Sequence, residues 1–63
     1  MGKYLDGMTI KGKYFGVTVV GVVRESRMRR NELIHYTDVL VDDFVPRMDS
    51  VIVRDCDVEW AVE

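Results

Sequence analysis

The stretch that most restricts the fold is YFGVTVVGVV, residues 14–23. It is rich in β-branched and aromatic residues and is interrupted by glycine, which is typical of a strand. Its apolar residues change face along the way: Val19 lies on one face, whereas Val20 and Val22 lie on the other. A strand with one solvated face would not do this. We therefore predict a bend at Gly21, since glycine tolerates a kink or bulge, and a sheet that curves into a very small barrel.

The rest of the chain also has strand character, and no segment repeats with a helical period over three turns. A polar hairpin tip, a proline-containing loop and a tight turn separate the strands. Trp60 alternates with acidic residues in the last strand, which predicts that it is a core residue. The fold class is thus all-β, with about five short, strongly bent antiparallel strands. The expected strands are residues 8–10, 14–24, 33–41, 50–54 and 58–62, after a loose lead-in over 1–7 and with breaks at 25–31, 42–49 and 55–57.

This arrangement resembles an SH3-like barrel. The spacing of Ile10-Lys11-Gly12, then Gly16, then Gly21-Val22-Val23 loosely resembles the KOW type, in which glycines separate the first strands. The resemblance covers about a third of the chain, and the gap between Gly16 and Gly21 is longer than in that motif. It implies a fold of the SH3 kind, and contact with RNA or RNA polymerase as one option.

The chain has 63 residues, which predicts a single domain over 1–63 with marginal stability. Chains of this size usually need a disulfide, a metal or a partner chain. One cysteine cannot form an internal disulfide, and His35 and Cys56 are too few soft ligands for a structural zinc site. We therefore expect a homo-oligomer, with a dimer as the first choice, and no metal or cofactor.

Charge is distributed unevenly along the chain. Residues 1–31 carry a net charge of +5 and residues 32–63 a net charge of −7, which together give −2. If strands from the two halves pair, the charges neutralise each other across the sheet. Otherwise the molecule has a basic end and an acidic face, which favours head-to-tail contacts or two different charged partners. The sequence leaves both interpretations open.

Location and catalysis are constrained by what the sequence lacks. No apolar segment is typical of a secretory signal or long enough for a membrane span, so we expect a cytoplasmic protein without membrane contact.

Cys56 lies between Asp55 and Asp57, and nearby carboxylates raise the pKa of a thiol, which opposes a nucleophilic role. His35 lies in a strand and is more typical of a packed residue. We therefore predict no catalytic residues and no enzyme activity.

The best candidate for binding is the arginine-rich segment 24–31, whose planar guanidinium groups suit phosphate or carboxylate. A solvated hairpin tip is the alternative interpretation. A second candidate is an aromatic residue beside a proline in the loop 42–49, which either covers the barrel end or contacts a partner. The predicted partner-binding residues are Arg24, Arg27, Met28, Arg29, Arg30, Phe44 and Met48.

Together these features predict a non-catalytic binding or regulatory protein with a protein partner that offers an acidic or phosphate-bearing surface. The short chain without a linker suggests an accessory or inhibitor protein of a phage, plasmid or bacterium. The alternative is a barrel that contacts RNA or DNA through Lys11, Lys13 and the arginines. An isoelectric point near 5.3 opposes this alternative, because nucleic-acid domains are usually basic.

Overall fold

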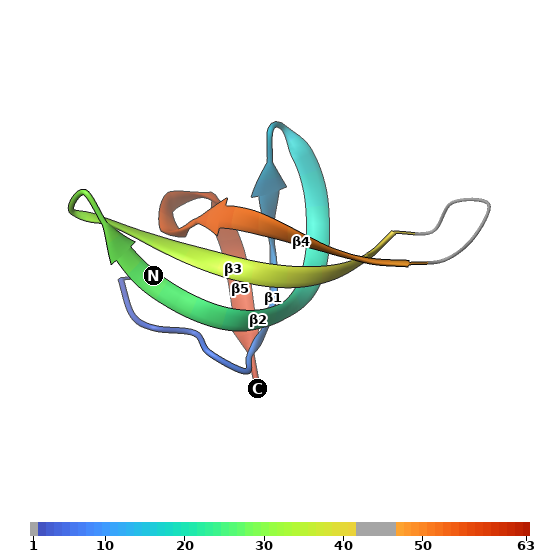
Figure 1. Cartoon of the computed structure of the whole chain (residues 1–63), viewed down its shortest axis with the longest axis horizontal. Helices are drawn as coiled ribbons and strands as arrows, with labels where there is room; N and C mark the ends of the chain where they lie inside the picture. The colour runs from blue at the N-terminus through green and yellow to red at the C-terminus, as the bar shows by residue number, and fades with distance from the viewer. Residues whose placement is uncertain (1, 42–46) are drawn as a thin grey trace.

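The computed structural model describes residues 2–41 and 47–63 and consists of one five-stranded antiparallel sheet (Figure 1). The strand order is β4-β3-β2-β1-β5, and a short 3-10 turn, η1, joins β4 to β5. This confirms the predicted all-β class. The strands are β1 (Thr9–Tyr14), β2 (Val17–Arg29), β3 (Glu32–Val41), β4 (Arg47–Arg54) and β5 (Val58–Val62), with η1 at Asp55–Asp57.

The curvature of the sheet comes from the long strand β2, which pairs with β1 in its first half and with β3 in its second. The predicted bend at Gly21 falls where these two pairings overlap, at Gly21 and Val22, but the bulge itself lies further along the strand. The register shifts between Val23 and Glu25, so Arg24 is the extra residue of a bulge. This extra residue reverses the alternation: Val23 is buried before it and Ser26 after it. Gly21 has another role, because a Cβ there would collide with the backbone of β3.

Two tight turns connect the first three strands, and each places a large side chain in the left-handed region. In the β1–β2 turn, Phe15 has φ 49° and Gly16 has φ 78°. In the β2–β3 turn, Arg30 has φ 52° and Asn31 has φ 63°. The predicted tip over 25–31 is therefore too long, because β2 continues to Arg29 and only two residues turn. Two-residue turns with positive φ match the twist of paired strands, so the hairpin closes without a longer loop.

The apolar core is small and includes residues from the amino-terminal segment. Leu5, Ile10, Val23 and Val53 are almost completely buried and pack together. The prediction of a loose lead-in is therefore wrong, since Leu5 fills the core. The prediction for Trp60 is also wrong: its side chain is 41% exposed on the outer face, beside Lys11 of β1.

A buried polar network holds the amino-terminal segment against the sheet. Ser26 Oγ accepts a hydrogen bond from the Leu5 N–H at 2.9 Å and lies 2.7 Å from His35 Nδ1. His35 Nε2 lies 2.9 Å from Asp55 Oδ1, and Asp55 Oδ2 accepts the Gly2 N–H at 2.6 Å. Both ring nitrogens of His35 therefore have a hydrogen-bond partner, Ser26 on one side and Asp55 on the other.

The ladder has two edges, β4 and β5. Closure of the sheet into a barrel stays a prediction, since the recorded pairings end at these two strands. Strand β4 begins at Arg47, inside the predicted loop 42–49. Within the described part of the chain, no helix is long and apolar enough to cross a membrane.

Candidate binding groove

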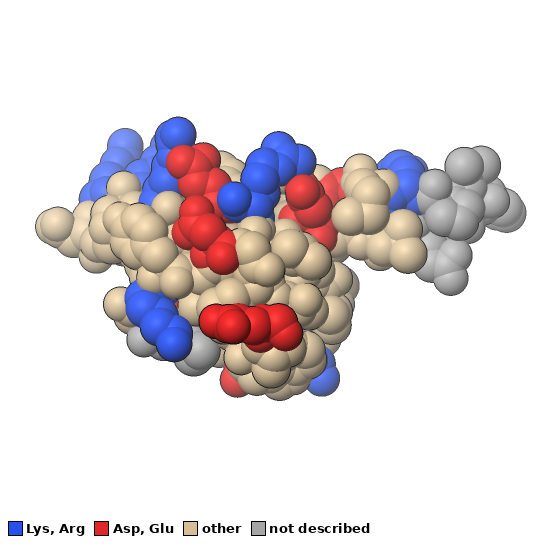
Figure 2. Space-filling view, turned by 90° about the horizontal axis from the view of Figure 1, so that it is seen from below, with Lys and Arg blue, Asp and Glu red and all other residues tan. Residues whose placement is uncertain are grey.

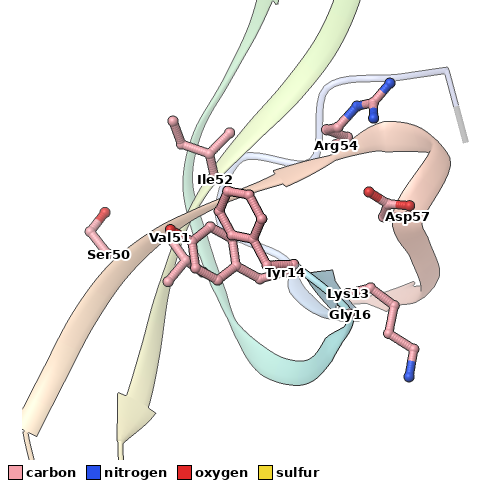
Figure 3. Close-up of a pocket in the computed structure, with 9 residues that line it drawn as sticks. Lys13, Tyr14, Gly16, Ser50, Val51, Ile52, Arg54 and Asp57 are labelled. Carbon is pink, nitrogen blue, oxygen red and sulfur yellow. The ribbon is translucent and has the colours of Figure 1, made fainter.

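A groove of about 750 Å³ lies between the β1–β2 turn and strand β4. Apolar and aromatic side chains line its middle, and charged side chains lie at its rim. Figure 3 shows Tyr14 directed toward Val51 and Ile52, with Arg54 and Asp57 to one side. We call this cavity the β4 groove. Its lining residues are Lys13, Tyr14, Phe15, Gly16, Ser50, Val51, Ile52, Arg54 and Asp57.

Phe15 is the most exposed large apolar side chain described in the structure. It is 90% exposed, although its ring meets the Tyr14 ring edge-to-face with centroids 4.7 Å apart. Its positive φ is unfavourable for a bulky residue, and asparagine or glycine suits this turn position better. An exposed aromatic ring in a strained backbone conformation makes Phe15 a candidate contact residue.

Strand β4 offers hydrogen-bonding groups to the β4 groove. It pairs with β3 along one side, and no strand of the described chain pairs with its other side. The central residues 50–53 are uncharged, whereas Arg47, Asp49 and Arg54 flank them. Charged residues usually protect an edge strand from further pairing. Here they leave the central part, which borders the groove, open to an added strand.

A second hollow of about 220 Å³ adjoins the β4 groove and shares Ile52 and Arg54 with it. Arg29 and Arg30 line its far side, and we call it the arginine hollow. Its complete lining is Arg29, Arg30, Glu32, Ile34, Ile52 and Arg54. Glu32 hydrogen-bonds to Arg54, and this hydrogen bond is the main cause of the raised pKa of Arg54. In the described part of the chain, Arg29 and Arg30 have no ion pair.

The structure divides the predicted arginines into two groups. Arg24 binds the Asp38 carboxylate across the strands at 2.6 Å, and Arg27 binds Glu25 at 2.9 Å. Arg27 also lies over the Tyr36 ring, 5.9 Å from its centroid. Of the four predicted arginines, only Arg29 and Arg30 line the arginine hollow, where they lie with Arg54. Figure 2 shows basic side chains gathered toward the end with the β2–β3 turn, and acidic and basic groups interspersed along the middle.

This distribution answers part of the charge question raised by the sequence. The Arg24–Asp38 pair joins the two halves of the chain, as expected for neutralisation across strands. The pair formed by Arg47 and Asp49 lies within one strand. Charge is thus mixed over the face seen in Figure 2 rather than separated into one basic and one acidic surface.

The remaining predicted contact residues lie apart from this site. Met28 is exposed near the end of β2, and Met48 is exposed on β4 opposite Leu40. Neither lines the β4 groove or the arginine hollow. Phe44 falls outside the described residues.

Sequence reasoning missed the aromatic half of the site. Tyr14 and Phe15 were assigned to a continuous strand, and Arg54 was treated only as the end of a short strand. A usable signal was present in the sequence. Phe15 and Gly16 stand between a segment with alternating lysines and a segment rich in valine, and this pattern indicates a two-residue turn. No sequence pattern indicated that β4 would lie beside that turn, because this proximity depends on the curvature of β2.

The Ser26–His35–Asp55 arrangement has the residue types of a hydrolytic triad but not its geometry. In such triads His Nε2 faces the serine and Nδ1 faces the carboxylate, whereas here the two nitrogens are exchanged. Ser26 is buried, and its oxygen accepts the Leu5 N–H. This arrangement gives Ser26 a structural role in holding the amino-terminal segment.

Two opposing influences act on Asp55. Burial raises its pKa, while hydrogen bonds from His35 and from the Gly2 N–H lower it, and the net shift is downward. The carboxylate form is therefore the stable partner of His35. Among residues 2–41 and 47–63, no group of three or more His, Cys, Asp or Glu side chains is placed to hold a metal ion.

No protein-family model, curated protein or solved structure matches this chain.

Proposed function

We propose that the protein is a cytoplasmic, non-catalytic binding module that holds an extended segment of a partner protein in the β4 groove. The observation that carries the proposal is the position of an uncharged, unpaired strand edge beside the exposed Phe15 ring. Main-chain hydrogen bonds to an edge strand supply affinity without regard to sequence, and side-chain pockets supply specificity. An accessory or inhibitor protein of a phage, plasmid or bacterium would use such a site to attach to a larger protein.

The side chains of the groove indicate the composition of the segment. Tyr14, Val51 and Ile52 favour an apolar or aromatic side chain, because they remove its surface from water. Arg54 and the adjoining arginine hollow favour an anionic side chain further along the segment. We therefore propose a ligand that combines one apolar anchor with one anionic residue.

Single-stranded nucleic acid is the alternative ligand. Aromatic rings and arginines together suit stacked bases and phosphates. The carboxylates of Asp57 and Glu32 lie in the same two cavities and oppose a continuous phosphate backbone. A peptide with one anionic residue avoids this repulsion, which is why the peptide is preferred.

The proposal is tested by selecting binders from a library of random linear peptides displayed on phage. We expect enriched peptides that pair an apolar with an acidic residue. Phe15→Ala should weaken their binding at least about tenfold, as expected for an aromatic anchor. Val62→Ala is the control, because Val62 is an apolar residue, 52% exposed, on the opposite edge strand. N-methylation of the peptide on the side that faces β4 should also abolish binding, since it removes main-chain donors.

Equal affinity of the parent and Phe15→Ala for the selected peptides would contradict the proposal. Tight, Phe15-dependent binding of an oligothymidylate, with a steep dependence on salt, would replace it with the nucleic-acid alternative.

Self-association remains a second proposal. The outer face of β2 and β5 carries several exposed apolar side chains, among them Val20, Val22, Trp60 and Val62. A second copy would cover this surface and add stability that a core of this size lacks. Sedimentation equilibrium should give a dimer that Trp60→Lys dissociates. A monomer at tens of micromolar would contradict it.

A further inference from the structure

The arginine hollow has a charge surplus that the peptide proposal alone does not explain. Its lining contains three guanidinium groups and one carboxylate. Glu32 is already bound to Arg54, so this pair contributes no net charge. Two positive charges remain, on Arg29 and Arg30. Neither of them has an ion pair in the described part of the chain, so both guanidinium groups are available to an anion.

The backbone supports the same conclusion for Arg30. With φ 52°, this residue occupies the first position of a two-residue turn, where asparagine, aspartate or glycine would be less strained. Placing arginine there carries an energetic cost, because a bulky side chain disfavours the left-handed conformation. The turn directs its side chain to the hollow that Arg29 and Arg54 also line. The side chain, rather than the turn, accounts for the presence of arginine.

The shape of the hollow suits a compact group with several oxygen atoms. A volume of about 220 Å³ is several times the share of one water molecule, roughly 30 Å³. Ile34 and Ile52 supply the apolar part of its lining, against which the carbon atoms of a phosphorylated side chain can pack. Arginine forks bind phosphate oxygens in pairs, and a phosphorylated side chain carries a charge of about −1.5 to −2 at neutral pH. This charge matches the surplus of two, whereas a carboxylate matches half of it.

We infer that the arginine hollow is a phosphate subsite that recognises a phosphorylated side chain on the segment bound in the β4 groove. This inference rests on the proposed function, since the groove supplies the rest of the ligand. Ile52 and Arg54 belong to both cavities, so the phosphorylated residue follows the apolar anchor along β4 toward the β2–β3 turn.

The test compares three versions of a selected groove-binding peptide, with phosphoserine, glutamate or serine at the position nearest Arg54. We expect the phosphoserine version to bind the parent protein at least about tenfold more tightly than the serine version. The double variant Arg29→Ala, Arg30→Ala should lose this advantage and keep its affinity for the serine version. The double variant Arg24→Ala, Arg27→Ala is the matched control, because both arginines are already paired, and it should keep the advantage.

A second measurement does not require any peptide. Titration of the isotope-labelled protein with phenyl phosphate should shift the side-chain NMR signals of Arg29 and Arg30 in a saturable way, and benzoate should shift them less. Unchanged arginine signals would overturn the inference, even if no peptide binds the groove.

The outcomes of the two proposals are separable. Loss of serine-peptide binding in Phe15→Ala concerns the groove, whereas the gain from phosphate concerns the hollow. Equal binding of the phosphoserine and serine versions by the parent overturns the phosphate subsite and leaves the groove standing. Equal binding of the glutamate and phosphoserine versions also overturns it, because a single negative charge would then suffice.

Discussion

The same strand, β2, supplies residues to both the buried network around His35 and the arginine hollow. The polar side chains of the two regions differ in burial and in whether they have a partner. Ser26 and Arg29 are three residues apart on β2. Ser26 is buried, and its hydroxyl group hydrogen-bonds to the Leu5 N–H and to His35 Nδ1. Arg29 is exposed, and no ion pair involves it in the described part of the chain. One polar group holds the fold together, and the other is available to a ligand.

The difference shows how the Arg24 bulge organises the molecule. Before the bulge, Val19 and Val23 face the core, and after it Ser26 does. Ser26 is thereby directed inward to His35, while Arg27 and Arg29 face outward. Within the described residues, no buried side-chain nitrogen or oxygen lacks a hydrogen-bond partner. Unpaired polar charge is thus confined to the surface, where it costs little.

The largest predicted effect concerns the buried network around His35. His35→Ala should lower the free energy of unfolding by about 3 kcal/mol, because it opens a cavity and removes the hydrogen bonds that His35 makes to Ser26 and Asp55. A domain of this size is stable by on the order of 3–9 kcal/mol, so the variant is close to unfolding. Urea denaturation followed by tryptophan fluorescence measures the change.

Arg24→Ala is the control for that prediction, since it breaks an exposed ion pair with Asp38. It should cost no more than about 1 kcal/mol. If His35→Ala does not unfold at all, His35→Gln, which keeps a side-chain donor, should recover part of the stability. A His35→Ala variant as stable as Arg24→Ala would show that the network contributes nothing special.

A smaller effect is expected from acid. The pKa of Asp55 is lower in the folded protein than its ordinary value of about 3.9. Its contribution to stability is therefore present above about pH 4 and is lost as the pH falls through the lower folded value. We expect the free energy of unfolding to fall as the pH falls through this range, because the unfolded chain then binds the proton more readily. Urea denaturation at neutral pH and at about pH 3 measures it. Asp55→Asn should be less sensitive to this change, and equal sensitivity would assign the acid effect to other carboxylates.

The sequence was informative about elements and much less so about their contacts. The alternation of valines and the absence of a helical period correctly predicted five antiparallel strands. The change of face in β2 was also read correctly as a sign of bending, but the bulge lies at Arg24 rather than Gly21. Glycine tolerates a bulge well, so the sequence alone favours Gly21 as its position. Other residues also tolerate a bulge, and the pairing of β2 with β3 places it at Arg24.

The binding site was predicted only in part for a related reason. Arginines are visible in a sequence, whereas their ion pairs are not, so Arg24 and Arg27 were indistinguishable from Arg29 and Arg30. The partners of the first two, Asp38 and Glu25, are set by register and bulge geometry. The lead-in, described from residue 2 to residue 7, is ordered by a polar network whose members are distant in the sequence, which local composition does not show.

On the exposed side, Arg30→Asn should increase stability by about 0.5–1 kcal/mol, because asparagine accepts the left-handed conformation of the turn. The same variant should weaken binding of phenyl phosphate. Thermal unfolding combined with the NMR titration measures both effects. Arg29→Asn, in a strand rather than the turn, is the control and should lose phosphate binding without gaining stability. A destabilised Arg30→Asn would mean that the turn itself requires the arginine.

The smallest effect is predicted for Cys56→Ser. Cys56 lies in η1 between the network residue Asp55 and the groove residue Asp57, yet its thiol is exposed and forms no disulfide. The substitution should change the free energy of unfolding by less than about 0.5 kcal/mol, as for most surface changes, and should leave peptide binding unaltered. Urea denaturation and peptide titration measure these two quantities. Because η1 is where the buried network and the β4 groove come closest along the chain, this variant also tests their separation. A loss of both stability and binding in Cys56→Ser would mean that η1 couples the two regions, and the contrast between a structural side and a binding side would no longer hold.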